Sequence, residues 1–141
     1  MSTAPGSYVP TPEGLNVDFH RRAVETGRLH VQRCAACGVL RHPPRWYCAS
    51  CASPDWELVP SSERGTVHSY TVTHLTFDPA WAAEAPFATL VVELDEGPRV
   101  VAAARGMAPD EVSIGRRVRV TVEPRGEEFA FLWAEPEDTT P

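Results

Sequence analysis

Four cysteines, arranged as two Cys-x-x-Cys pairs, constrain this chain more than any other feature of its sequence. They are Cys34, Cys37, Cys48 and Cys51. Each such turn directs two sulfurs at one point, and two turns complete the tetrahedral thiolate site that structural Zn²⁺ prefers. The sequence therefore predicts one structural Zn²⁺ bound by all four cysteines.

The expected compartment favours metal over disulfide chemistry. Residues 1–14 lack the apolar core of a secretory signal, and no segment approaches the roughly 18 apolar residues of a membrane span. We therefore expect a cytoplasmic protein without membrane contact. Disulfides are rare in the reducing cytoplasm. Two redox Cys-x-x-Cys motifs or free thiols are the alternative, but a thioredoxin motif belongs at a helix start in a β-α-β setting that this sequence does not predict.

The two cysteine pairs differ in the residue that follows them. Gly38 follows the first pair and suits a tight backbone turn, whereas Ala52 follows the second. The separation between the pairs is also shorter than the usual range. Neither departure removes a ligand. The apparent free energy of zinc binding in small peptide sites is on the order of 10–16 kcal/mol. This contribution offsets the small hydrophobic core of such a ribbon.

Hydrophobic periodicity and turn residues divide the chain into three parts. A Pro- and Gly-punctuated arm leads into a helix over residues 16–26, with Asn16 as N-cap and Gly27 as the stop. We expect the arm and helix over residues 1–30, a rubredoxin-like zinc ribbon over 31–60, and a β-barrel with a C-terminal tail over 61–141.

The barrel half contains five segments rich in β-branched or aromatic residues. They cover residues 66–76, 87–94, 100–104, 117–123 and 129–134. No long crossover helix separates them, which argues against a parallel β-α-β arrangement. The sequence therefore predicts a mainly β protein, with a five-stranded barrel of the oligonucleotide/oligosaccharide-binding type (OB-fold) after the ribbon. In the last hairpin, we expect three valines to pair with three aromatic residues, and we assign all six to the core. They are Val118, Val120, Val122, Phe129, Phe131 and Trp133.

Charge is divided unevenly between the two halves. Residues 1–64 hold seven Arg against six acidic residues, whereas residues 65–141 hold six Arg against thirteen. Ribbons and OB barrels serve as single-stranded nucleic-acid-binding modules on other chains, and such a stand-alone module is the alternative function here. The acidic barrel argues against nucleic acid as a partner, because it repels a phosphate backbone.

Catalytic groups are not evident. With the cysteines bound to zinc no thiol nucleophile remains, and no motif marks an activated serine. His42, His68 and His74 fit structural or surface roles, with His68 and His74 on one side of a predicted strand. Asp95 and Glu96 lie in a predicted turn, where solvent exposure is expected. We predict no catalytic residue.

Two groups of residues are candidate contacts. The ribbon insert combines arginines with aromatic residues and suits a phosphate or nucleotide, with a solvated rim as the alternative. The long loop after the first barrel strand carries aromatic residues that suit a partner or an acyl chain, with barrel-capping core as the alternative. The candidates are Arg41, Arg45, Trp46, Phe77, Trp81 and Phe87.

Taken together, these residues resemble the zinc-ribbon plus OB-fold family once described as a domain of unknown function and associated with acyl-CoA metabolism. The resemblance rests on the helix, on both cysteine pairs, and on the segments 27–29, 43–45, 65–67 and 86–87. It implies a small subunit that works beside a thiolase-fold, lipid-transfer-protein-like partner. Such complexes include acyl-CoA thiolases, acetoacetyl-CoA synthesis complexes and retro-aldolases that shorten sterol side chains as CoA esters.

The resemblance carries over the four cysteines as zinc ligands and no catalytic residue, because the chemistry resides mainly in the partner. We therefore expect a non-catalytic accessory subunit that shares an acyl-CoA substrate with a thiolase-fold subunit. Its most specific version is a retro-aldolase, a lyase that cleaves a steroid side-chain CoA thioester. A carrier that binds acyl-CoA or lipid alone is a further alternative.

Overall fold

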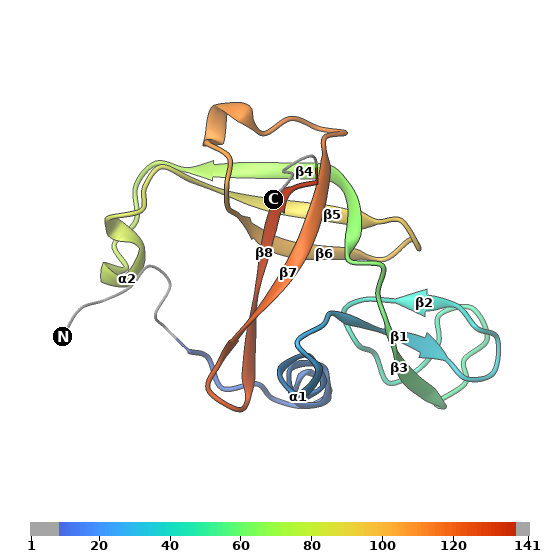
Figure 1. Ribbon diagram of the computed structural model, residues 1–141. Helices are drawn as coiled ribbons and strands as arrows, with labels where there is room; N and C mark the ends of the chain where they lie inside the picture. Colours follow the sequence, from blue (N-terminus) through green and yellow to red (C-terminus); the bar gives the residue numbers. More distant parts are fainter. Residues whose placement is uncertain (1–8, 138–141) are drawn as a thin grey trace.

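The computed structural model describes residues 9–137, so the start of the predicted arm and the end of the predicted tail lie outside the described residues. A ribbon sheet of order β2-β1-β3 lies beside a closed barrel of order β4-β5-β6-β8-β7 (Figure 1). The ribbon strands are β1 (His30–Cys34), β2 (Leu40–Arg41) and β3 (Trp56–Pro60). The barrel strands are β4 (Arg64–Thr73), β5 (Phe87–Leu94), β6 (Arg99–Ala104), β7 (Arg117–Arg125) and β8 (Phe129–Pro136). The predicted mainly β fold with a five-stranded barrel is confirmed.

Three short helices accompany the sheets in the described chain: α1 (Asn16–Thr26), α2 (Pro79–Ala82) and the 3-10 helix η1 (Pro109–Glu111). None of the helices within residues 9–137 is long and apolar enough to cross a membrane.

Helix α1 lies beneath the barrel, between the β7–β8 hairpin and the ribbon (Figure 1). The predicted stop is confirmed, because Gly27 takes a left-handed φ of 69° and its N–H donates to the carbonyl of Ala23 at 2.8 Å. The predicted N-cap is wrong. Asn16 is already helical, and its N–H donates to the carbonyl of Glu13 at 3.2 Å, so a backbone turn replaces the side-chain cap.

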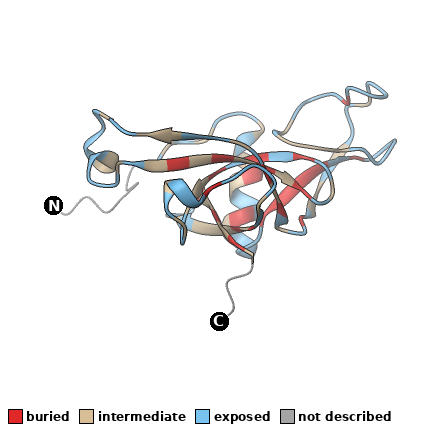
Figure 2. Ribbon diagram, turned by 90° about the horizontal axis from the view of Figure 1, so that it is seen from above, coloured by how far each residue is buried: buried red, intermediate tan, exposed pale blue. Residues whose placement is uncertain are grey.

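One hydrophobic core runs from the barrel into the ribbon. Alternate residues of β5 are buried, as expected for a strand with one face inside a barrel. Phe19 of α1, Leu29 just before β1, and Val31 within β1 belong to the same cluster as the barrel residues. Figure 2 shows buried segments concentrated along the barrel strands. Packing therefore holds the helix and the ribbon against the barrel.

The register of the β7–β8 hairpin corrects the predicted core. Trp133 pairs with Thr121 and not with a valine, whereas Val120 pairs with Ala134. Because neighbouring side chains of a strand point to opposite faces, the valines face inward and the aromatic residues of β8 face outward. Val118 and Val120 are fully buried, whereas the three aromatic residues are only partly buried. The predicted pairing differs from the observed register by three residues, and a shift by an odd number of residues exchanges the two faces.

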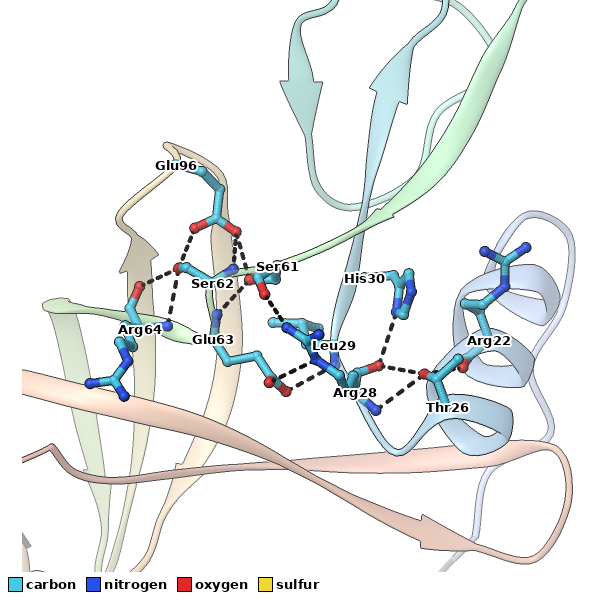
Figure 3. A network of polar contacts seen from close by, with 10 residues as sticks. All are labelled: Arg22, Thr26, Arg28, Leu29, His30, Ser61, Ser62, Glu63, Arg64 and Glu96. Carbon is cyan, nitrogen blue, oxygen red and sulfur yellow. Dashed lines mark hydrogen bonds and ion pairs between the residues drawn. The ribbon is translucent and has the colours of Figure 1, made fainter. Parts of the chain in front are cut away.

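A hydrogen-bonded joint fixes the ribbon to the barrel (Figure 3). The Glu96 carboxylate, in the β5–β6 turn, accepts from the hydroxyl of Ser61 at 2.6 Å and from the backbone N–H of Ser62 at 3.0 Å. The Glu63 carboxylate accepts from the backbone N–H of Leu29 at 3.1 Å. Contrary to the expected exposure, Glu96 is partly buried, because the segment that leaves β3 folds over the turn.

Candidate metal centre and contact surfaces

The four predicted cysteines meet at the tip of the ribbon. Their Sγ atoms all lie within 4.8 Å of one another, with Cys34 and Cys51 3.6 Å apart and Cys37 and Cys48 also 3.6 Å apart. A tetrahedron with Zn–S bonds of about 2.3 Å has S···S edges of about 3.8 Å. The donor set and its spacing therefore fit one Zn²⁺ in a closed, structural site.

The two cysteine turns share one backbone conformation. The N–H of Gly38 donates to the carbonyl of Cys34 at 2.9 Å, and the N–H of Ala52 donates to the carbonyl of Cys48 at 2.8 Å. Gly38 has a φ of 81° and Ala52 a φ of 63°, so both occupy the left-handed region. The second turn therefore adopts this conformation without the glycine that favours it.

Electrostatics show why these sulfurs need a cation. The backbone N–H of Cys37 is the largest cause that lowers the pKa of Cys34 to about 6. The backbone N–H of Ser53 lowers the pKa of Cys51, but the neighbouring sulfurs and burial outweigh it and raise that pKa to about 12. Several thiolates this close repel one another, and a bound Zn²⁺ would neutralise them.

The ribbon insert places its two candidate arginines differently. The guanidinium of Arg41 donates to the side-chain oxygen of Gln32 and, at 3.1 Å, to the carbonyl of Arg45. The N–H of Arg45 donates to the same Gln32 oxygen at 2.8 Å. Arg41 thus holds the insert in shape, whereas Arg45 is exposed beside Trp46, which is 63% exposed.

The candidate aromatic residues of the 74–86 loop also divide. Trp81, in α2, packs against Phe87 at 5.1 Å and Phe131 at 5.8 Å between ring centroids. Asp78 caps α2 by accepting from the N–H of Ala80 at 2.9 Å. Phe77, in contrast, is 92% exposed. The loop is therefore anchored by Trp81 and presents Phe77 to the outside.

A cavity of about 590 Å³ lies between α1, the ribbon insert, the 74–86 loop and the outer faces of β5, β6 and β8. Two histidines line it beside aromatic rings. The ring centroids of His42 and Phe19 lie 4.9 Å apart, and His20 stacks on Phe129 with a centroid distance of 4.7 Å. Burial, and then the charge of His20, lowers the pKa of His42 to about 4, so its ring is neutral near pH 7.

This cavity was not predicted from the sequence. Its walls use the outward residues of β8 that the sequence had suggested for the core, so the alternation along 129–134 is the signal that locates it. His68 and His74 take no part. Both are exposed, and a register shift between Val67 and Ser69 interrupts the strand before His74, which lies beyond its end.

On the neighbouring surface of the hairpin, arginines cover the aromatic rings. Arg105 lies 4.7 Å from the centre of the Trp133 ring, and Arg125 lies 4.1 Å from that of Phe131. Their carboxylate partners are Glu135 (2.7 Å) and Glu123 (2.6 Å). Single-strand binders stack bases on such rings beside free cations. This paired surface does not favour that use.

Comparison with known proteins identifies the two parts of the chain. Residues 21–57 match the family model described as ChsH2, rubredoxin-like zinc ribbon domain, and residues 58–123 match ChsH2, C-terminal OB-fold domain. Together with the cysteine cluster, the ribbon match confirms the predicted Zn²⁺.

Individual relatives carry related names. The chain is 40% identical over 139 residues to a probable enoyl-CoA hydratase alpha subunit of Thermomonospora curvata, covering 97% of this chain and 40% of that protein. It is 37% identical over 134 residues to the 3-oxo-4,17-pregnadiene-20-carboxyl-CoA hydratase alpha subunit of Mycobacterium tuberculosis, covering 95% and 42%. The chain therefore spans about two fifths of the length of these two relatives.

A solved structure covers the fold almost completely. The chain superposes on a chain of an Ltp2-ChsH2(DUF35) aldolase with a TM-score of 0.80 and 38% sequence identity, covering 91% of this chain and 98% of the other.

Proposed function

Because the chain belongs to the ChsH2 family of zinc-ribbon and OB-fold proteins, as its motifs predicted, we propose that it is an accessory subunit of a steroid-related CoA-thioester complex. In its most specific form, the partner is a thiolase-fold subunit and the reaction is retro-aldol cleavage of a steroid side chain. The observation that carries this proposal is the near-complete match to the Ltp2-ChsH2(DUF35) aldolase chain.

The residues of this chain fit an accessory role. Its four cysteines are all committed to the zinc cluster, so no thiol nucleophile is left. In a retro-aldol step a base removes the proton of a β-hydroxyl group, the bond between Cα and Cβ breaks, and the oxygen becomes a ketone. Cα leaves as the enolate of the CoA ester and is then protonated. We assign these proton transfers to the partner.

The contribution of this chain is to dock the partner and to shape the substrate entrance. Arg45 is exposed on the ribbon insert, which Arg41 and the nearby zinc cluster hold in shape. A guanidinium placed in this way suits the phosphates of CoA. The zinc acts as a structural cross-link and takes no part in the reaction.

Reconstitution tests the proposal. The chain is mixed with the Ltp2 subunit of the solved complex and with a steroid side-chain β-hydroxyacyl-CoA, and the released short acyl-CoA is measured by mass spectrometry. Cleavage by the mixture, and none by this chain alone, is the expected result. If the two subunits form a stable complex that releases no more short acyl-CoA than the Ltp2 subunit alone, the accessory role is refuted. Titration with single-stranded DNA at low salt checks the nucleic-acid alternative, for which we expect no binding.

A further inference from the structure

The cavity beside α1 is an open, apolar groove built from separate parts of the chain. Its walls include Phe19 of α1, Trp81 of α2, Phe87 of β5, and Phe129 and Phe131 of β8. With a volume of about 590 Å³, it has room for several aromatic side chains, because a cavity of about 150 Å³ holds a benzene molecule. This groove lies outside the interior of the barrel, and none of the four cysteines lines it.

Exposed apolar side chains surround the groove. Val101 of β6, itself a lining residue, is 61% exposed, and Phe77, between the lining residues Thr76 and Asp78, is 92% exposed. On the ribbon side Trp46 and Tyr47 are 63% and 66% exposed. Each aromatic side chain carries about 150–250 Å² of surface. An exposed apolar rim of this extent is characteristic of an interaction site.

Trp46 and Tyr47 adjoin the groove through shared neighbours. They line a second hollow together with Asn16 and Pro44, and Asn16 also lines the groove, as does Pro43. The ribbon insert, the 74–86 loop and β6 therefore contribute to one continuous surface. We call the groove and these four rim residues (Trp46, Tyr47, Phe77 and Val101) the aromatic groove.

The charged side chains of the groove walls are already engaged, whereas the exposed Arg45 lies outside these walls, in the hollow beside Trp46 and Tyr47. Arg99 lies 3.8 Å from the carboxylate of Glu93, and Asp78 is hydrogen-bonded at the start of α2. Its two histidines both have lowered pKa values, chiefly through burial, and are neutral near pH 7. A phosphate or carboxylate would meet no unpaired cation among these described wall residues. The charge pattern therefore selects an apolar occupant.

The occupant is large, because the rim extends beyond the groove. A small molecule that filled the groove would leave Phe77 and Trp46 in water, whereas a protein surface would cover them as well. The groove is also preformed, since Trp81 fixes the loop against Phe87 and Phe131, and the joint of Figure 3 fixes the ribbon to the barrel. Preformed surfaces of this kind lose little conformational entropy on binding.

We propose that the aromatic groove is the surface on which the thiolase-fold partner docks, by inserting apolar side chains from a helix or loop into it. This inference rests on the proposed accessory function and specifies where the partner binds. Phe77 and Trp46 are the anchors of the interface, and binding is dominated by apolar burial and not by ion pairs.

The test compares variants of exposed residues, whose replacement leaves the fold intact. The variants are Phe77→Ser, Trp46→Ser and their combination, and the matched control is Ile114→Ser. Ile114 is 72% exposed, but it lines none of the described groove and its loop lies at the opposite end of the barrel from α1 (Figure 1). Zinc content and thermal unfolding verify that each variant is folded.

Affinity for the Ltp2 subunit of the solved complex is measured by calorimetry at low and at high salt. We expect the double variant to bind at least about 30-fold more weakly, the loss typical of one hot-spot side chain. The control should stay within about twofold, and salt should change the wild-type affinity little.

Other outcomes separate the two proposals. A wild-type chain that binds no Ltp2 subunit refutes the accessory function and with it the docking site. A double variant that binds as tightly as the control refutes the docking site and leaves the accessory function standing. Saturable binding of palmitoyl-CoA by the isolated chain, lost in the double variant while subunit affinity is unchanged, would assign the groove to an acyl chain instead.

Discussion

Each cysteine turn has one residue in the left-handed conformation, and replacing that residue should change the stability of the zinc-bound ribbon. Ala52 has a φ of 63°, which costs an L-residue about 1–2 kcal/mol, whereas glycine there loses about 0.5–1 kcal/mol through greater freedom in the unfolded chain. Ala52→Gly should therefore stabilise the zinc-bound ribbon by about 0.5–1 kcal/mol. Gly38→Ala places an alanine at a φ of 81° and should destabilise it by a similar amount.

A steric clash does not add to the cost of the Gly38→Ala substitution. A Cβ atom built there meets no atom within 4 Å, so the conformation alone decides the cost. Folding of a small zinc ribbon is coupled to metal binding, and a change of about 1 kcal/mol therefore alters the apparent zinc affinity about fivefold.

Competition with a chromophoric chelator measures that affinity, and thermal unfolding at saturating zinc measures stability independently. We expect Ala52→Gly to bind zinc more tightly than the wild type and Gly38→Ala more weakly. The double exchange should lie near the wild type, because the two effects have opposite signs. Equal or weaker affinity in Ala52→Gly would refute the reasoning, since it would mean that the left-handed conformation of Ala52 carries no cost.

Three further predictions follow from the joint, the groove and the ribbon insert. Glu96→Ala removes the acceptor of two serines and should lower the free energy of unfolding by about 1–3 kcal/mol in denaturant titrations. The pKa of His42 falls from 6.5 to about 4 in the fold, so the unfolded chain binds the proton more tightly between these values. Stability should rise by up to about 3 kcal/mol from pH 4 to pH 6.5, and His42→Gln should remove that part of the rise. Arg45→Ala should raise the KM for the CoA thioester severalfold in the reconstituted complex, with unchanged thermal unfolding.

Controls accompany each of these measurements. Glu127→Ala changes an exposed turn carboxylate and should leave the free energy of unfolding unchanged. The pH profile is taken as the difference between wild type and His42→Gln, so that protonation of the cysteines cancels; identical profiles would contradict the role of His42. Arg22→Ala, on the exposed side of α1, should leave the KM unchanged, and an equal effect of both arginines would point to general electrostatics.

Local chemistry made much of this protein predictable. The two Cys-x-x-Cys turns indicated the zinc ribbon because their spacing alone brings pairs of sulfurs together. The helix ended where predicted, since Gly27 accepts a left-handed conformation that other residues avoid. Four of the five barrel strands began within a residue of the predicted start, because the alternation and the glycine-containing turns are local signals.

Other features depend on contacts that no local pattern encodes. The sequence placed the aromatic residues of β8 in the core, but the register with β7 turned them outward, and a shift by an odd number of residues decides between these faces. Arg41 looked equivalent to Arg45 until the fold brought Gln32 beside it. Glu96 looked like an exposed turn residue until the ribbon-to-barrel segment folded over it.

The sequence by itself determined the zinc ligands, the order of helix, ribbon and barrel strands, and the family to which the chain belongs. Only the tertiary structure decided which aromatic residues are buried, which arginine is free to meet a ligand, and that the helix, the insert and the barrel enclose one groove. The physical reason is distance along the chain. Ligand spacing and strand alternation act over a few residues, whereas the groove joins segments as far apart as His20 and Ala130, whose side-chain to backbone hydrogen bond of 3.2 Å forms only in the folded protein.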